Sequence, residues 1–343
     1  MSDAAFDVWV RNTLLRVEQA LSQWVPADAP AGLGEAMRYG VLDGGKRLRP
    51  LLVHAACEAV GGNPDAALRA AVAVELIHAY SLVHDDMPCM DNDVLRRGKA
   101  TVHVQFGQAG AMLAGDAMQA LAFEVLTPAA DPGHRPGRAD EPAIPPVLQA
   151  RLCGLLARAA GHAGMAGGQA IDLASTGKPL DEASLRDMHR RKTGALLQAS
   201  VLMGAVTGDC SPAAWAALNE FGAALGLAFQ VVDDILDVTQ ASDKLGKTAG
   251  KDQGANKPTY VTVLGLAEAR RQARALHQQA LAALERSGLE HRSGLEHRSG
   301  LEHRSGLEPR SGLEPRNGHG SAGRLAHTHH LRLLADMVVD RES

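Results

Sequence analysis

The chain has 343 residues, of which 45% are hydrophobic and only 3% are aromatic. Alanine is abundant, and alanine is the best helix former, whereas β-branched and aromatic residues favour strands. The composition therefore predicts a mainly helical protein. The formal net charge of −4 argues against a nucleic-acid partner, so any cationic binding site must be local.

The cysteines and the N-terminus indicate a cytoplasmic protein. The four cysteines are scattered without a Cys-x-x-Cys pair, which is typical of reduced thiols. The N-terminus carries Asp3 and Asp7 and no basic start, unlike a secretory signal. No uncharged apolar run reaches membrane-spanning length, so we expect no stable membrane insertion.

Apolar residues that recur at three- and four-residue steps predict a first helix over residues 3–24. The same pattern predicts helices over residues 51–60, 66–84, 101–126, 147–173, 181–208, 212–238, 261–285 and 324–340. Four glycines between 161 and 168 interrupt the 147–173 segment, and each costs a helix about 1 kcal/mol relative to alanine. We expect close packing or a kink there.

Two segments depart from this pattern within an expected single domain over residues 1–343. Residues 127–146 are rich in proline, glycine and charge, and predict a surface loop. Residues 287–316 repeat Ser-Gly-Leu-Glu-His-Arg three times and then Ser-Gly-Leu-Glu-Pro-Arg twice. Leucines six residues apart form no apolar stripe on a helix. We interpret the repeat as a low-complexity linker inserted before the last helix.

Two aspartate clusters each end a long apolar segment. They contain Asp85, Asp86 and Asp91 in the first and Asp233, Asp234 and Asp237 in the second. Carboxylates this dense repel one another unless a cation lies between them, and Mg²⁺ takes a few carboxylates together with substrate phosphates. A solvated acidic helix end explains one cluster equally well. Two clusters of the same form favour a shared metal site.

The spacing within each cluster is compatible with that site. On a helix, Asp233 and Asp237 lie on one face because they are four residues apart. Pro88 cannot continue a regular helical ladder, so a bulge could return Asp91 toward Asp85.

Basic residues accompany the acidic clusters. Glycine permits close approach of a ligand, and Lys and Arg contact phosphates. The candidates are Lys46 and Arg49 after Gly44-Gly45, Arg96 and Arg97 after the first cluster, Lys192 with Thr193, and Lys247 and Lys257 after the second cluster. His78 lies two helical turns before Asp85, with Ser81 between them, and Gln230 lies one turn before Asp234. Surface ion pairs or a solvated helix face explain each group alone.

In this order, the motifs resemble those of the trans-isoprenyl diphosphate synthases, of the bacterial farnesyl diphosphate synthase type. The resemblance is carried by Gly44-Gly45-Lys46-Arg47-Leu48-Arg49-Pro50, by His84 to Asp91 with Arg96-Arg97-Gly98, and by Gln230 with Asp233-Asp234-Ile235-Leu236-Asp237. It covers nearly the whole chain outside residues 127–146 and 287–316. It implies an all-α isoprenoid synthase bundle around a deep central cavity, usually as a homodimer.

The resemblance also implies the chemistry: Mg²⁺-dependent condensation of isopentenyl diphosphate with dimethylallyl or geranyl diphosphate. Asp85, Asp86 and Asp91 would bind two Mg²⁺, and Asp233 with Asp237 a third, so that about three ions serve the site. Asp234, Lys192 and Arg96 would join them in the catalytic set. The allylic diphosphate would be held by Arg96, Lys192, Thr193, Gln230, Lys247 and Lys257, and isopentenyl diphosphate by Lys46, Arg49, His78 and Arg97.

Product length is implied by the residues before Asp85. Tyr80 and Ser81 occupy the fifth and fourth positions before it, and a tyrosine at the fifth position resembles the farnesyl (C15) type. A geranylgeranyl or geranyl diphosphate synthase is the alternative within the family. A terpene cyclase and a non-catalytic regulatory subunit are the rivals from other classes. The second Asp-Asp-x-x-Asp motif and the Gly-Gly-Lys-x-x-Arg motif favour the synthase over the cyclase. The presence of both acidic motifs favours it over the regulatory subunit.

Overall fold

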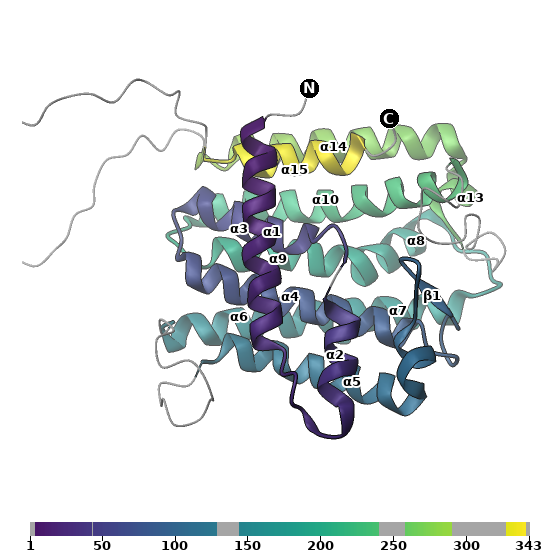
Figure 1. The fold of residues 1–343 in the computed structure, drawn as a ribbon. Coiled ribbons are helices and arrows are strands. Elements are labelled where there is room, and N and C mark those ends of the chain that lie inside the picture. The colour runs from purple at the N-terminus through teal and green to yellow at the C-terminus, as the bar shows by residue number, and fades with distance from the viewer. Residues whose placement is uncertain (1–3, 43, 129–143, 240–257, 290–326, 341–343) are drawn as a thin grey trace, which may run out of the picture.

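The computed structural model describes residues 4–42, 44–128, 144–239, 258–289 and 327–340 (Figure 1). Apart from one short hairpin, the regular elements in these ranges are helices. They are α1 (Ala4–Trp24), α2 (Leu33–Val41), α3 (Leu48–Val60), α4 (Pro64–Asp85), α5 (Val102–Leu126), α6 (Pro146–Ala160), α7 (Met165–Ser175), α8 (Glu182–His189), a π-helical segment (Arg190–Gly194), α9 (Ala195–Ala205), α10 (Pro212–Thr239), α13 (Tyr260–Leu264), α14 (Leu266–Arg286) and α15 (His329–Val339). A 3₁₀ turn (Pro30–Gly32) precedes α2, and β1 (Leu95–Arg96) pairs with β2 (Lys99–Ala100). The all-α prediction is confirmed.

The segment 147–173 forms α6 and α7, which are separated at residues 161–164, so the interruption expected at its glycines is confirmed. Two other predictions of continuous helices were wrong. The segment 181–208 is interrupted by the π-helical residues, and 261–285 breaks at Gly265, whose φ of +81° is a left-handed value. The apolar pattern persists across these two breaks, so periodicity alone missed them. Helix α2 and the β1–β2 hairpin were not predicted.

Helix α4 lies at the centre of the bundle because it is apolar on all sides. It begins where the Asn63 side chain accepts hydrogen bonds from the backbone N–H groups of Asp65 (2.9 Å) and Ala66 (3.0 Å), with Pro64 as the first helical residue. It contacts α3, α5 and α9, while α10 packs against α9 and α14. The chain leaves α4 toward β1 and leaves α10 toward α13, so the carboxyl ends of both helices lie at one end of the bundle (Figure 1).

Helix α15 is held by its own contacts. Its buried face joins residues of α3, α10 and α14 in one apolar cluster. The Glu58 carboxylate of α3 accepts a hydrogen bond from Trp9 Nε1 (2.8 Å) and one from His330 Nδ1 (2.7 Å), and the Trp9 and His330 rings stack at 4.1 Å. These contacts dock α15 against α1 and α3.

We therefore predict that a chain without residues 290–316 keeps its thermal stability and catalytic rate. The predicted linker over residues 287–316 starts too early, because Ser287 and Leu289 are buried and Leu289 belongs to the core. The deletion therefore starts at residue 290 and leaves residues 317–326 to reach α15. Ten extended residues span up to about 35 Å, and the two described chain ends that they must join lie at the same end of the bundle (Figure 1). Thermal denaturation and steady-state rates test this. A folded variant with a large loss of turnover would contradict it.

Two helices, α4 and α5, have the length and hydropathy of membrane spans. In α4, 78% of the apolar window is buried inside the bundle, which identifies it as a core helix. In α5 only 44% of the window is buried, so this helix presents a second, exposed face.

Candidate active site

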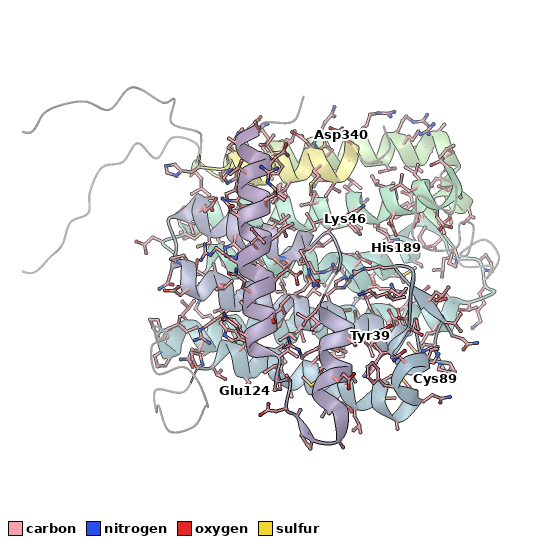
Figure 2. All side chains as sticks on the ribbon, in the orientation of Figure 1. Tyr39, Lys46, Cys89, Glu124, His189 and Asp340 are labelled. Carbon is pink, nitrogen blue, oxygen red and sulfur yellow. The ribbon has the colours of Figure 1, made fainter. Side chains whose placement is uncertain are left out.

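A cavity of about 390 Å³ opens beside the carboxyl end of α4. Cavities of this size bind small molecules. Its polar lining includes Arg49, His78, Asp85, Lys192 and Thr193, and Tyr80, Ser81, His84, Met165 and Leu173 are among the remaining lining residues. The cavity therefore brings together the start of α3, the carboxyl end of α4 and the π-helical segment. Gln230 and Asp234 of α10 line a separate pocket, which shares Lys192 with this cavity. Figure 2 shows Cys89 and His189 toward the right of the view, on the side where α8 and β1 lie, and Glu124 at the lower left.

The first acidic cluster folds back on itself after α4. The backbone N–H of Asp91 donates to the carbonyl oxygen of Asp85 (2.8 Å), and that of Asp93 donates to Asp86 (3.0 Å). Pro88 lies at the turn. The predicted bulge that returns Asp91 toward Asp85 is confirmed.

Burial is the main cause that raises the pKa of Asp85 to about 6. The positive charge of Lys192 acts against burial and lowers the pKa, whereas the negative charge of Asp91 raises it further. The protein thus crowds carboxylates where water solvates them poorly, an arrangement that favours a bound cation.

Asp86 points to a different neighbour from Asp85. Its carboxylate is buried and accepts hydrogen bonds from Arg96 Nε (3.0 and 2.8 Å) and Arg96 Nη2 (2.5 Å). The pair lines a separate pocket with Arg97 and Lys99 between α2, α4 and the hairpin. In this structure Asp86 fixes Arg96, and its role as a metal ligand stays a prediction.

The residues of the second acidic cluster lie in different surroundings. Asp234 is buried and accepts hydrogen bonds from Gln230 Nε2 (2.8 Å) and from the backbone N–H of Tyr260 (2.7 Å). It therefore joins α10 to the start of α13, and its place in the catalytic set stays a prediction. Asp233 and Asp237 follow the helical spacing that places them on one face, with Asp233 partly exposed and Asp237 buried.

The π-helical segment presents Lys192 and Thr193 to the cavity. Lys192 Nζ donates to Asp172 Oδ2 of α7 (2.5 Å), and the Thr193 hydroxyl donates to Gln230 Oε1 (2.9 Å). Gly168 permits this approach, because a Cβ there would lie 2.2 Å from the backbone nitrogen of Lys192. π-Helical turns within helices often occur at functional sites.

The basic loop before α3 is held by a buried ion-pair network. Arg47 has a left-handed φ of +47° and donates to Glu18 (2.6 Å), Glu75 (2.6 Å) and the Val41 carbonyl oxygen (2.5 Å). Burial lowers the pKa of Arg49 to about 10, whereas the negative charge of Glu75 raises it. Burial also lowers the pKa of His78 well below its usual value, and Arg49 lowers it further.

Arg97 packs over the two glycines of this loop. A Cβ on Gly44 or Gly45 would lie 2.9 or 2.7 Å from the Arg97 guanidinium. The glycines thus allow Arg97 to lie against the loop that precedes α3, and the positive charges of Arg49 and Arg97 both lower the pKa of His78. His78 lines the cavity with Arg49.

Sequence reasoning missed two carboxylates that organise these cations. Glu75 lies three residues before His78 and pairs with Arg47, and Asp172 lies three residues after Gln169 and pairs with Lys192. Each carboxylate has an apolar residue on either side of it in the sequence of its helix, and this was the signal available before the structure. Lys247 and Lys257, also predicted to bind substrate, lie outside the described residues.

We predict that Glu75→Ala destabilises the protein by about 3–5 kcal/mol, because it leaves Arg47 buried without its main counter-charge. The control is Glu285→Ala, since the Glu285 pair with Arg332 is largely exposed and its loss changes stability by less than about 1 kcal/mol. Denaturant unfolding measures both. Equal effects of the two substitutions would contradict the structural role of Glu75.

The acidic residues suit Mg²⁺ bound jointly with a phosphate ligand. Within the described ranges, no three His, Cys, Asp or Glu side chains form a set that could hold a metal ion alone. Mg²⁺ does not require such a set, because it commonly binds one or two carboxylates together with waters and substrate phosphates. Asp85 with Asp91, and Asp233 with Asp237, supply that kind of partial shell.

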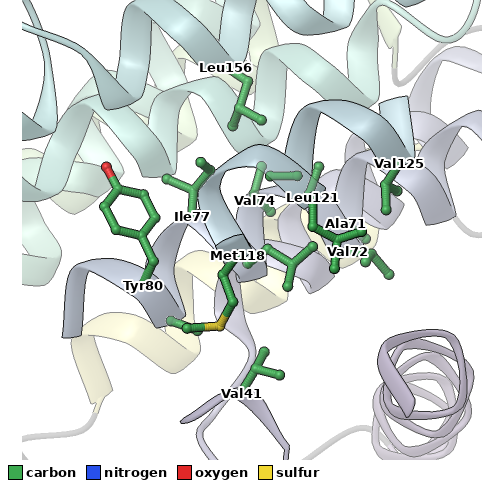
Figure 3. Close-up of a cluster of buried hydrophobic side chains, with 14 of the residues drawn as sticks. Val41, Ala71, Val72, Val74, Ile77, Tyr80, Met118, Leu121, Val125 and Leu156 are labelled. Atoms are coloured by element: carbon green, nitrogen blue, oxygen red, sulfur yellow. The ribbon is translucent and has the colours of Figure 1, made fainter. Parts of the chain in front are cut away.

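Tyr80 and Ser81 line the cavity one to two turns before Asp85. Figure 3 shows Tyr80 at the end of a row of side chains on α4 that includes Ile77 and Val74, with its ring on the side where Leu156 lies. Burial raises the pKa of Tyr80, and so does the Asp85 charge. The ring therefore forms an apolar wall close to the acidic cluster.

Comparisons with known proteins decide the family. The family model described as polyprenyl synthetase matches residues 30–290. The chain belongs to the polyprenyl synthetase family. It is 45% identical over 271 residues to the farnesyl diphosphate synthase of Geobacillus stearothermophilus, covering 79% of this chain and 88% of that one. It is 48% identical over 267 residues to the large subunit 1 of a heterodimeric geranylgeranyl pyrophosphate synthase from Arabidopsis thaliana, covering 77% and 70%.

The polyprenyl synthetase fold is matched in solved structures as well. A geranyltransferase from Helicobacter pylori, complexed with magnesium and isoprenyl diphosphate, superposes with a TM-score of 0.70 at 34% identity, covering 83% of this chain and 92% of that one. Enzymes of the family are Mg²⁺-dependent prenyltransferases that use isopentenyl and allylic diphosphates. The chain is therefore a trans-prenyl diphosphate synthase, and its relatives include both farnesyl and geranylgeranyl diphosphate synthases.

Proposed function

We propose that the chain condenses isopentenyl diphosphate with dimethylallyl and then geranyl diphosphate to give (2E,6E)-farnesyl diphosphate. One observation carries the proposal: a single cavity joins Asp85, Lys192 and Thr193 to Arg49 and His78, and Tyr80 forms part of its wall. The first group suits an allylic diphosphate and the second suits isopentenyl diphosphate. The tyrosine suits a chain limit at fifteen carbons.

The acidic residues hold the metal in this proposal. Asp85 and Asp91 hold two Mg²⁺, Asp233 with Asp237 holds a third, and Asp86 contributes by fixing Arg96. When bound, Mg²⁺ neutralises the negative charge that develops on the departing diphosphate. One carboxylate pair at the end of α4 and in the turn after it, and a second pair on α10, support a count of about three ions.

The remaining residues orient substrates and stabilise charge. Lys192, Thr193, Gln230 and Arg96 bind the allylic diphosphate, whose C–O bond breaks to leave an allylic carbocation. Lys46, Arg49, His78 and Arg97 bind isopentenyl diphosphate so that its double bond attacks that cation. The apolar walls exclude water from the cation. The released diphosphate accepts the proton that is lost, so no side-chain base is assigned.

A geranylgeranyl diphosphate product is the second candidate. The observation that favours it is the 48% identity to a subunit of an Arabidopsis thaliana geranylgeranyl pyrophosphate synthase. Tyr80 is the reason that we prefer the shorter product.

We further propose a homodimer in the cytoplasm. After the kink at Gly107, α5 exposes the neighbouring residues Met112 and Leu113, with 41% and 58% of their surfaces exposed. An apolar helix face of this kind suits a second subunit. A heteromeric assembly is the alternative, since the Arabidopsis thaliana relative is named as heterodimeric. Four free cysteines support a reducing compartment.

Release of diphosphate tests the reaction class. We expect release when geranyl diphosphate and isopentenyl diphosphate are present together with Mg²⁺, and none when isopentenyl diphosphate is omitted or EDTA is added. A terpene cyclase would release diphosphate from the allylic substrate alone. Folded protein that is inactive with both substrates would instead indicate a regulatory subunit.

A further inference from the structure

His84 lies one helical turn after Tyr80 on α4, and the two rings meet edge to face. Their centroids are 5.7 Å apart and their planes are inclined at 75°. Both side chains line the 390 Å³ cavity. The orientation of the Tyr80 ring is therefore coupled to the position of the imidazole.

The imidazole is fixed from the other side by α5. Its Nε2 donates a hydrogen bond to the carbonyl oxygen of Met112 (3.1 Å). It also rests over Gly115, which is buried, and a Cβ at that position would lie 2.0 Å from His84 Nε2 and 2.5 Å from His84 Cδ2. Because no larger residue leaves room for the ring, glycine at 115 is a condition for the observed position of His84.

We propose that His84, seated on Gly115, is a positioning residue that sets product length by holding the Tyr80 ring in the cavity wall. The inference rests on the proposed function, which gives Tyr80 the role of chain limit. It adds that Tyr80 does not act alone: α5 fixes His84, and His84 fixes Tyr80. We class His84 as a positioning residue because its contacts are with Tyr80, Met112 and Gly115.

The direction of the effect follows from the space that His84 fills. Without the imidazole, the Tyr80 ring loses its edge contact and gains free volume next to it. The ring can then leave its observed rotamer and enter that volume. A growing isoprenoid chain can then displace the Tyr80 ring and extend further into the cavity, so products longer than those of the wild type accumulate.

The first test is the product distribution of His84→Ala with geranyl and isopentenyl diphosphates. We expect the ratio of longer to wild-type-length products to rise several-fold. This ratio is independent of total activity, so a partial loss of turnover does not obscure it. His277→Ala is the matched control, since His277 is also partly buried and hydrogen-bonded, to Asp336 at 2.8 Å, but does not line the cavity.

Gly115→Ala tests the same idea without changing a cavity side chain. Alanine favours a helix more than glycine does, so α5 is retained while the added methyl group displaces the His84 ring. We expect a shift in product length in the same direction as for His84→Ala.

The double variant Tyr80→Ala/His84→Ala separates a positioning role from a general loosening of the fold. We expect the same distribution as Tyr80→Ala alone, because His84 acts only through Tyr80. The inference would be overturned if His84→Ala and Gly115→Ala left the product-length ratio unchanged while Tyr80→Ala made longer products. It would also be overturned if the double variant shifted that ratio by the sum of the two single shifts. The length of the wild-type product tests the proposed function and the shifts test this inference, so the two can fail separately.

Discussion

Asp85→Asn should abolish turnover and, at the same time, stabilise the ligand-free protein. The amide cannot supply the charge that a metal ligand needs, and we expect the rate to fall by more than about 100-fold. The stability gain arises because the wild-type carboxylate is ionised in a buried site, next to the negative charge of Asp91. Active sites commonly carry such destabilising groups.

The pH dependence of this gain follows from the raised pKa. The pKa of Asp85 rises from its ordinary value of 3.8 to about 6 on folding, so the folded protein binds its proton more tightly than the unfolded chain. The contribution of protonated Asp85 to the free energy of unfolding is full below pH 3.8 and is lost as the pH rises through 6. Asparagine does not ionise, so the variant gains about 1–3 kcal/mol at pH 7.5 and less at pH 5.

Thermal denaturation in EDTA at these two pH values measures the effect. Asp187→Asn is the control with the opposite sign, because hydrogen bonds from Arg191 and Arg190 lower the pKa of Asp187. That substitution should not stabilise the protein at pH 7.5. A melting temperature for Asp85→Asn that is equal to or below the wild-type value at pH 7.5 would contradict the burial of this charge.

Tyr80→Ala should change the main product from C15 to C20. The substitution removes an aromatic ring that is 9% exposed and forms part of the cavity wall, so the chain gains room for another isoprene unit. Tyr80→Phe is the matched control. It keeps the ring and drops the hydroxyl, and we expect it to stay at C15.

Chromatography of the dephosphorylated alcohols distinguishes these outcomes. Product length is compared at equal conversion, so that slow turnover is not mistaken for chain termination. If Tyr80→Ala makes only the C15 alcohol while remaining active, Tyr80 is not the chain limit.

The predictions from sequence succeeded where chemistry depends on local spacing. The return of Asp91 toward Asp85 followed from Pro88, and the cationic loop followed from two glycines before Lys46. The ends of α4 and α10 were also well placed, because each helix has a long apolar pattern and a polar end.

The features that sequence missed depend on tertiary contacts. The π-helical turn at Lys192 follows an apolar pattern that an α-helix also satisfies, and its close approach to Gly168 joins segments far apart in the chain. The neighbouring carboxylates Asp85 and Asp86 are alike in sequence, but Arg96 of the hairpin donates its hydrogen bonds to Asp86. A pattern that covers one element at a time does not contain this information.

The central claim is that this cavity extends an allylic diphosphate to fifteen carbons. The most direct measurement is to incubate the purified protein with isopentenyl and geranyl diphosphates and Mg²⁺ and to size the dephosphorylated product. The account predicts a C15 alcohol that is absent when EDTA is added. A main product of C20 would contradict the length assignment, and a cyclic hydrocarbon would contradict the proposed reaction itself.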